Sequence, residues 1–351
     1  MENRVHHWVA AVAMLAVCLP LPTTAQRADM PRGTVIANNM LDHTVTMLDA
    51  STGRVLATLP TGKGPHEVAI SHDGRWALVS NYGVRGEPGN SITVIDVARR
   101  SVVRTISLAE HRRPHGMAFL PGDSLFAVTC ETDRAVLIVG FPDDRIRSVL
   151  PSGGRASHML SVSSNGQRMV VANIADGTIS VVDLSTQREP RVIPVARQPE
   201  GIAIAPDGRT AWVGSNQDSV VLVVSLDSAA KTDTLRGFGL PYRMAISGDG
   251  RRAVITDPAK AQVSIFDVGR RRVTATVQIP RDSVLAAAEV PGSPSPEGVV
   301  LSRDGRWAFV TLQGRNRVAT IDLDRGVIVG YAVTGNWSDG IGFSPLSGSA
   351  P

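Results

Sequence analysis

The stretch PHEVAISHDGRWALVSN, residues 65–81, sets the pattern from which the fold follows. It joins two apolar runs through an Asp-Gly turn, which is a strong hairpin signal because these residues tolerate positive φ. The same order recurs as PHGMAFLPGDSLFAVTC, SHMLSVSSNGQRMVVAN, PEGIAIAPDGRTAWVGS, PYRMAISGDGRRAVITD and PEGVVLSRDGRWAFVTL. The repeats start near residues 65, 114, 157, 199, 241 and 296. Spacings of 42 to 55 residues are typical of propeller blades.

Each repeat continues with two further β-rich runs, such as SITVIDV and VVRTISL. Four strands with short connections form an antiparallel meander, which must stack on neighbours to bury both faces. The chain ends supply the missing parts of one more unit, because 33–62 holds three strands and 338–346 holds a first strand. We therefore expect an all-β, seven-bladed β-propeller with four-stranded antiparallel blades over residues 26–351. A split blade, made from the N-terminal strands and the C-terminal strand 339–345, closes the ring.

The segments TVIANN (34–39), ALVSN (77–81) and VVAN (170–173) end their strands in a similar way. They resemble the tyrosine-valine-threonine-asparagine signature of YVTN-family β-propeller repeats, and the resemblance covers about residues 32–346. It implies the propeller fold. Because that family spans surface-layer proteins, periplasmic binding proteins and lactonase-like enzymes, the resemblance does not fix an activity.

The first 25 residues have the composition of a secretory signal peptide. Arg4 precedes an apolar stretch from Trp8 to Leu21, and small residues precede a cleavage point after Ala25. The mature chain is therefore expected in the periplasm or outside the cell, with no transmembrane span after signal removal. The alternative is a lipoprotein with Cys18 as the lipid acceptor.

The composition excludes several function classes. The net charge of +4 comes without a long Lys/Arg block, and only 4% of residues are aromatic, so no nucleic-acid partner is expected. Motifs such as G-x-S-x-G, the P-loop, H-E-x-x-H and C-x-x-C are absent from the sequence. Neither a serine nor a cysteine nucleophile is therefore supported.

One position in each repeat is not explained by strands or turns. It lies seven residues before the turn aspartate of the opening stretch and can be followed through every unit. Its occupants are His66, His115, His158, Glu200, Tyr242 and Glu297, with Asp339 from the closing strand. Because the first strand of a blade lines the central channel, these residues predict a ring on a solvent-lined rim. The alternative is that they are ordinary polar residues at strand starts.

The three histidines come from adjacent blades and suggest a divalent transition metal. Imidazole suits Zn, Cu, Fe and Ni, and the opposite carboxylates could complete the site or act as acid and base. Nitrogens of His66, His115 and His158 within about 4 Å of a common point would favour a metal, since Zn–N bonds are about 2 Å. Widely separated rings would leave only a polar lip.

A second pattern lies three residues before the ring positions. It consists of Lys63, Arg112, Arg155 and Arg197, to which Arg113 and Arg243 add. On the top face these residues would form a basic collar that attracts anions. The longer loops 82–90 and 281–295 are expected on the same face, with Glu87 and Glu289 as further ligands.

Two hypotheses follow. The first is a monomeric, exported binding scaffold whose channel mouth takes a small anionic molecule or another exported protein. The alternative is a periplasmic enzyme, lactonase-like or lyase-like, that uses a metal or His/Glu acid–base chemistry at the channel mouth. The sequence identifies neither the ligand nor the substrate nor the metal.

Overall fold

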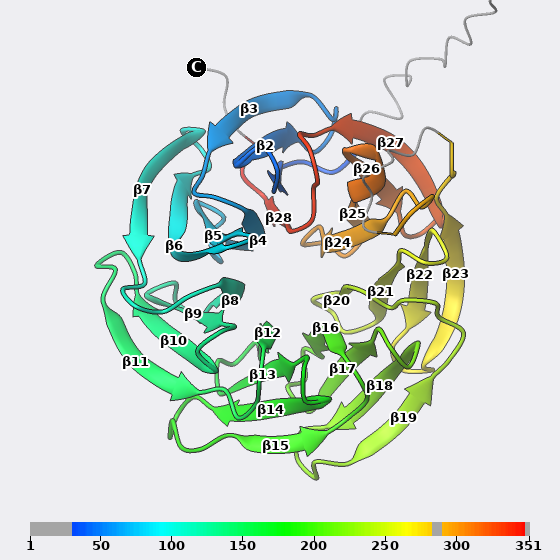
Figure 1. The fold of residues 1–351 in the computed structure, drawn as a ribbon. Coiled ribbons are helices and arrows are strands. Elements are labelled where there is room, and N and C mark those ends of the chain that lie inside the picture. Colours follow the sequence, from blue (N-terminus) through cyan, green and yellow to red (C-terminus); the bar gives the residue numbers. More distant parts are fainter. Residues whose placement is uncertain (1–29, 283–289, 348–351) are drawn as a thin grey trace, which may run out of the picture. The chain divides into compact units, whose positions relative to one another are not determined.

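The computed structural model describes residues 30–282 and 290–347. From Pro31 onward the chain forms one compact unit, in which seven four-stranded antiparallel sheets are arranged in a ring (Figure 1). The expected all-β, seven-bladed propeller is therefore confirmed. The expected signal peptide, Cys18 and Glu289 lie outside the described residues.

In six blades the strands run in chain order from the channel to the outside, and in the seventh the last strand, β28, lies inside β1, β2 and β3 (Figure 1). The innermost strands are β4 (Pro65–Ile70), β8 (Pro114–Phe119), β12 (Ser157–Val162), β16 (Pro199–Ile204), β20 (Met244–Ile246), β24 (Pro296–Leu301) and β28 (Ile341–Ser344). The second strands are β1 (Thr34–Asn39), β5 (Trp76–Val84), β9 (Leu125–Cys130), β13 (Arg168–Asn173), β17 (Thr210–Ser215), β21 (Arg252–Asp257) and β25 (Trp307–Leu312). The third strands are β2 (Thr44–Asp49), β6 (Glu87–Asp96), β10 (Ala135–Gly140), β14 (Thr178–Asp183), β18 (Val220–Ser225), β22 (Gln262–Asp267) and β26 (Arg317–Asp322). The outermost strands are β3 (Val55–Pro60), β7 (Ser101–Ser107), β11 (Ile146–Pro151), β15 (Arg191–Pro194), β19 (Lys231–Leu235), β23 (Arg272–Gln278) and β27 (Val327–Val333).

The ring is closed by a blade that the two ends of the chain share. Strand β1 pairs antiparallel with β28, and Thr34 lies opposite Ser344. This pairing confirms the split blade, although β28 begins at Ile341 rather than at residue 339. Closure removes the open sheet edges at which two chains could otherwise pair.

The hydrophobic core lies between neighbouring blades, because each sheet buries both faces of its middle strands. Trp212 meets Phe266 of the next blade with ring centroids 5.9 Å apart, and Trp76 meets Phe141 at 5.7 Å. Each pair is edge-to-face, an arrangement that adds to the free energy gained by burial. Cys130 is fully buried in this core.

The repeated aspartates are structural, as their position at strand ends and turns predicts. Asp73 accepts hydrogen bonds from the Ser71 hydroxyl at 2.5 Å and from the Arg75 amide at 2.8 Å. Asp183, at the end of β14, accepts bonds from the amides of Ser185 and Thr186. These bonds close the turns locally.

Within the described ranges the single helix is a 3₁₀ turn, Gln313–Arg315. No helix there has the length and apolar character needed to cross a bilayer.

Candidate metal site in the central channel

The site is built where the innermost strands depart from regular pairing. In β4 the register with β5 shifts between Pro65 and Val68, so His66 and Glu67 lie in a bulge. A bulge bends the strand and re-aims its side chains. The same shift occurs at the equivalent residues of β8, β12, β16 and β24.

The ring residues lie inside the protein and not on an open rim. The side chains of His66 and His158 are each 12% exposed, and His115 is 0% exposed. The other ring members, Glu200, Tyr242, Glu297 and Asp339, are all buried. The expectation of a solvent-lined rim is therefore wrong at these positions.

A glycine after the ring residue explains how the inner strands approach so closely. A Cβ atom on Gly340 would lie 2.1 Å from the carbonyl oxygen of His66, to which the Gly340 amide donates at 3.0 Å. A Cβ on Gly298 would lie 2.1 Å from the carbonyl oxygen of Asp339. A larger residue at these positions would hold neighbouring blades apart.

The three histidines stack on one another. The ring centroids of His66 and His115 are 4.2 Å apart, and those of His115 and His158 are 3.7 Å apart. The rings are therefore in contact and not widely spread, although the ligand atoms that lie close together come from His66, Glu67 and His115 and not from His158.

His115, in the middle of the stack, has no hydrogen-bond partner for either ring nitrogen among the described residues. Buried polar groups are nearly always hydrogen-bonded, and an unpaired one costs about 1–3 kcal/mol. Burial, and then the neighbouring His158, His66 and Arg243, lower the pKa of His115 well below its usual value. His115 is therefore a neutral imidazole, the form that binds a metal.

Carboxylates lie beside the stack. His66 Nδ1 is 3.4 Å from Asp339 Oδ2 and 3.7 Å from Glu67 Oε1. One ligand atom each from His66, Glu67 and His115 lie within 4.8 Å of one another. Burial opposes protonation of His66, but Asp339 and Glu67 outweigh it and raise its pKa.

A buried ion-pair chain crosses the channel next to the stack. His158 Nε2 is 2.7 Å from Glu200 Oε1, which also accepts a hydrogen bond from Arg243. Arg243 Nη2 donates to Glu67 Oε1 at 2.9 Å. Burial raises the pKa of Glu200, but His158 and Arg243 outweigh it and lower this pKa to about 2.

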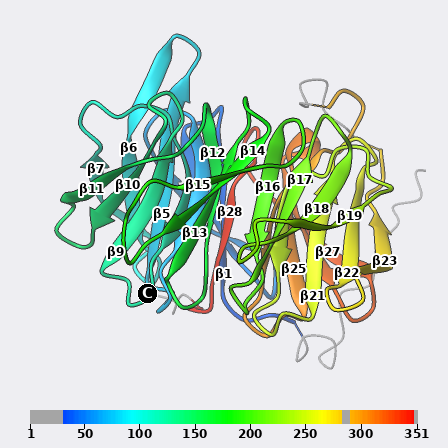
Figure 2. The same ribbon diagram turned by 90° about the horizontal axis from the view of Figure 1, so that it is seen from below.

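Tyr82 covers the stack from the long hairpin of β5 and β6. Its ring lies 5.1 Å from that of His66 and 5.5 Å from that of His115. The Tyr82 hydroxyl donates to Glu131 at 2.5 Å, and the Arg113 guanidinium lies over its ring. Figure 2 shows the hairpin, in cyan, projecting beyond the rest of the ring.

Two ring residues keep more local partners. Glu297 accepts hydrogen bonds from Gln313 Nε2 at 2.7 Å and from the Ser295 hydroxyl at 2.9 Å. The Arg243 guanidinium lies over the Tyr242 ring, with its central carbon 4.5 Å from the ring centroid. Burial and then Asp339 raise the pKa of Tyr242 well above its usual value, so it stays a neutral phenol.

The expected basic collar is largely neutralised. Lys63 is paired with Glu87 at 2.7 Å, Arg155 with Asp176 at 2.6 Å and Arg197 with Asp218 at 2.5 Å. At Arg112 the backbone amide donates to Asp133 at 2.8 Å, a contact that does not neutralise the guanidinium. The three Arg–Asp contacts join the loop before a first strand to the turn after the second strand of the same blade, so they support the blade.

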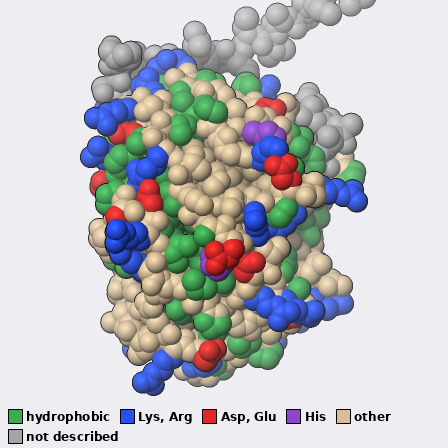
Figure 3. All heavy atoms as spheres, turned by 60° about the vertical axis from the view of Figure 1, so that its left-hand side comes forward, with side chains coloured by type: hydrophobic (Ala, Val, Ile, Leu, Met, Phe, Trp, Pro, Cys, Tyr) green, Lys and Arg blue, Asp and Glu red, His purple; other side chains and the backbone are tan. Residues whose placement is uncertain are grey.

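Arg243 is not part of the collar, because it is buried at 5% exposure in the channel. On the surface shown in Figure 3, acidic and basic side chains lie beside one another and are not gathered by sign. Side chains paired in this way attract anions less than free cations would.

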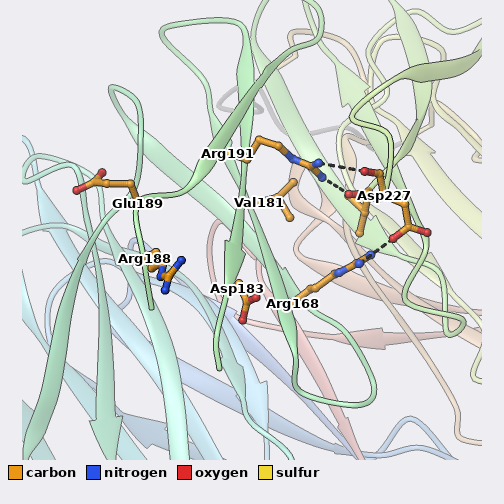
Figure 4. A pocket seen from close by; sticks show the side chains of 8 residues that line it. Arg168, Val181, Asp183, Arg188, Glu189, Arg191 and Asp227 are labelled. Carbon is orange, nitrogen blue, oxygen red and sulfur yellow. Dashed lines mark hydrogen bonds and ion pairs between the residues drawn. The ribbon is translucent and has the colours of Figure 1, made fainter. Parts of the chain in front are cut away.

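The hollows outside the channel are seams between blades. One of about 320 Å³ is crossed by Arg168 and Arg191, which contact Asp227 from the next blade (Figure 4). Another, of about 410 Å³, has the equivalent pair, Arg252 and Asp324. A third, of about 320 Å³, lies by Lys63 and Arg112 under the long hairpin.

Sequence reasoning missed Glu67 and Tyr82 and misplaced Arg243. The position after the ring residue is glycine in four repeats, namely Gly116, Gly201, Gly298 and Gly340. Glu67 and Arg243 occupy that same position with opposite charges, which is the signal that could have revealed the pair.

These features define a class: a closed seven-bladed propeller whose channel is filled by stacked imidazoles and paired carboxylates. Residues 121–338, more than half of the chain, match the family described as the Cytochrome D1 heme domain, and the chain belongs to that family.

More distant similarities agree with the fold. The chain is 20% identical over 291 residues to antigen Lp49 of Leptospira interrogans serogroup Icterohaemorrhagiae serovar copenhageni (strain Fiocruz L1-130), covering 80% of this chain and 59% of that protein. It thus spans about three fifths of that relative.

Two solved structures share the architecture. Hydrazine synthase of Kuenenia stuttgartiensis matches with a TM-score of 0.67 and 18% identity, over 89% of this chain and 99% of that chain. A functionally unknown protein from Desulfotomaculum acetoxidans DSM 771 matches with a TM-score of 0.74 and 13% identity, over the same shares. At these identities the likeness concerns the fold alone.

Proposed function

We propose that this chain is an exported, periplasmic β-propeller that binds one divalent transition-metal ion in its channel through His66, Glu67 and His115. The observation that carries the proposal is His115, a fully buried imidazole whose two nitrogens lack a hydrogen-bond partner among the described residues. A metal bond would satisfy one nitrogen and offset the cost of burying it.

The donor set suits a particular class of ion. Two imidazoles and one carboxylate favour Zn, Cu, Fe or Ni over the hard cations Mg and Ca, which prefer oxygen ligands. Three protein ligands leave a coordination position for water or a small ligand, as catalytic zinc sites do. His158, held by Glu200, supports the stack from the far side.

The family description names a haem, but the channel residues do not fit one. A haem iron is held by an axial side chain on the face of the macrocycle. The His115 ring has His66 and His158 beside it at 4.2 and 3.7 Å between centroids, so a macrocycle bound to one of its nitrogens would have to share that space with both rings. Arg243 also spans the channel between Glu200 and Glu67. A single metal ion is far smaller than a macrocycle and does not require these side chains to leave the channel.

The binding of a small anion or an exported partner at the channel mouth stays a prediction. The ion pairs of Lys63, Arg155 and Arg197 reduce the attraction on which it relied. The monomeric state and the lactonase-like or lyase-like activity also stay predictions. An enzyme of this kind would use the open coordination position of the metal.

The test is metal analysis and thermal unfolding of protein purified without a histidine tag. We expect about one ion per chain after incubation with Zn²⁺, Ni²⁺ or Cu²⁺, and a higher Tm. At 100 times Kd, binding adds about 2.7 kcal/mol to the free energy of unfolding. His115→Phe keeps the aromatic stack but should lose this effect.

The matched control is His72→Ala, which removes an exposed histidine on a turn and should leave binding unchanged. A wild-type protein that none of these ions stabilises would contradict the proposal.

A further inference from the structure

We propose that Arg243 is the resident counter-cation of the channel, and that it sets the metal affinity by competing with the ion for Glu67. The inference rests on the proposed metal site and concerns its regulation. In the absence of the ion the guanidinium holds Glu67; when the ion binds, Arg243 gives up Glu67 and keeps Glu200.

The first step is that Arg243 and the metal would share the Glu67 carboxylate. Glu67 Oε1 accepts the hydrogen bond from Arg243 Nη2 at 2.9 Å. It is also the atom 3.7 Å from His66 Nδ1, on the side of the candidate ligands. A divalent ion on Glu67 would therefore lie close to a guanidinium, and at short range in a buried site like charges repel strongly.

The second step is that Arg243 has another ion-pair partner, Glu200, when it releases Glu67. Its Nη1 already donates to Glu200, whose side chain is 4% exposed. The guanidinium can lose one bond and keep the other, so its charge is never left buried without a partner. Its stacking on Tyr242 also survives the change.

The third step is that the pair occupies positions at which glycine predominates in the other repeats. The equivalent position is glycine in the blades of β8, β16, β24 and β28, where a neighbouring strand passes. Only Met159, Glu67 and Arg243 break this pattern. Two of these three large residues carry opposite charges and meet across the channel, from β4 and from the segment before β20.

The fourth step is the charge balance. One guanidinium serves two carboxylates, Glu67 and Glu200. Both carboxylates contact the guanidinium, with 2.9 Å between Arg243 Nη2 and Glu67 Oε1. With both carboxylates ionised, the three groups carry one net negative charge. A divalent ion would therefore leave one net positive charge while Arg243 stays in place, whereas the two carboxylates alone would balance the ion.

The experiment compares Zn²⁺ affinity in wild type, Arg243→Met and Arg243→Lys by competition with a chromophoric chelator. Arg243→Met keeps bulk but removes the charge, and we expect at least tenfold tighter binding. Arg243→Lys keeps the charge and should stay within about threefold of wild type. Without Zn²⁺, Arg243→Met should unfold at a lower Tm, and saturating Zn²⁺ should raise its Tm more than that of wild type.

The outcomes separate the two proposals. Zn²⁺ binding that is equal or weaker in Arg243→Met, with wild type binding normally, overturns the role of Arg243 alone. No binding in either protein overturns the metal site itself. Binding that appears only in Arg243→Met supports the competition. If Arg243→Met does not fold, the double variant Arg243→Met/Glu200→Gln takes its place in the comparison, because it also removes the Glu200 charge and leaves the Glu67 carboxylate for the ion.

Discussion

His115 lies on His158 with ring centroids 3.7 Å apart and ring planes inclined by 36°. The contact joins adjacent blades at the centre of the ring. His158 has a partner in Glu200, whereas both nitrogens of His115 have none among the described residues. His115 therefore packs well against its neighbours, but its two ring nitrogens are buried without hydrogen bonds to the described residues.

Replacing that imidazole should make the metal-free protein more stable. His115→Phe keeps an aromatic ring between His66 and His158 and removes the unpartnered nitrogens, so we expect a gain of about 1–3 kcal/mol in the free energy of unfolding. Urea unfolding in the presence of a chelator measures it. A loss of stability of more than about 2 kcal/mol would show that the nitrogens are satisfied.

Glu200 should be one of the most sensitive positions in the channel. Glu200→Gln leaves Arg243 with a single carboxylate and weakens the contact with His158, and breaking a buried pair costs about 3–5 kcal/mol. The control is Glu189→Gln, an exposed residue for which a change within about 0.5 kcal/mol is expected. Equal unfolding midpoints in urea for the two variants would contradict the ion-pair chain.

Close approach of the inner strands predicts a contrast between two glycines. Gly340→Ala places a methyl group 2.1 Å from the His66 carbonyl oxygen, and such overpacking costs about 1–3 kcal/mol. Gly248→Ala, in an exposed turn with no atom within 4 Å of the added carbon, should cost little. Thermal unfolding of both variants tests the packing, and similar Tm values would argue against it.

Stability should fall in acid. Hydrogen bonds from the Ser185 and Ser247 hydroxyls lower the pKa of Asp183 and Asp249 below 3.8. At low pH the unfolded chain then binds more protons than the folded one, so this stabilisation is complete above about pH 4 and is lost as the pH falls through the folded-state pKa. Urea unfolding between pH 5 and pH 3 measures the slope, and Ser185→Ala with Ser247→Ala should reduce it. If the two substitutions leave the pH dependence of the free energy of unfolding unchanged, Asp183 and Asp249 are not the groups that cause it.

The repeats were sufficient to predict the blades, their order and the closing strand, because hairpin signals and apolar alternation are local. The ring positions followed from a constant offset, but their burial did not. It depends on bulges and on glycines that touch the neighbouring blade, such as Gly340 on His66.

The ion pairs of the collar residues escaped sequence reasoning for a different reason. The collar arginines have carboxylate partners at a constant distance along the chain, as Arg155 has in Asp176 and Arg197 in Asp218. A count of basic residues treats each arginine as unpaired. To predict its ion pair, one needs either the fold or a comparison of the arginine with the aspartate further along the chain. The link between Glu67 and Arg243 lies furthest from sequence reasoning, because it joins blades on opposite sides of the channel.

The shared blade has a consequence for the order of events during synthesis. Six blades consist of consecutive segments and can form as the chain emerges. Strand β1 must wait for β28, since Thr34 finds its partner only when Ser344 has been made. Bringing such distant segments together is slow because loop closure precedes the contacts that reward it. The edge of β1 thus stays unpaired until β28 arrives, so the ring closes only when nearly the whole chain has been made.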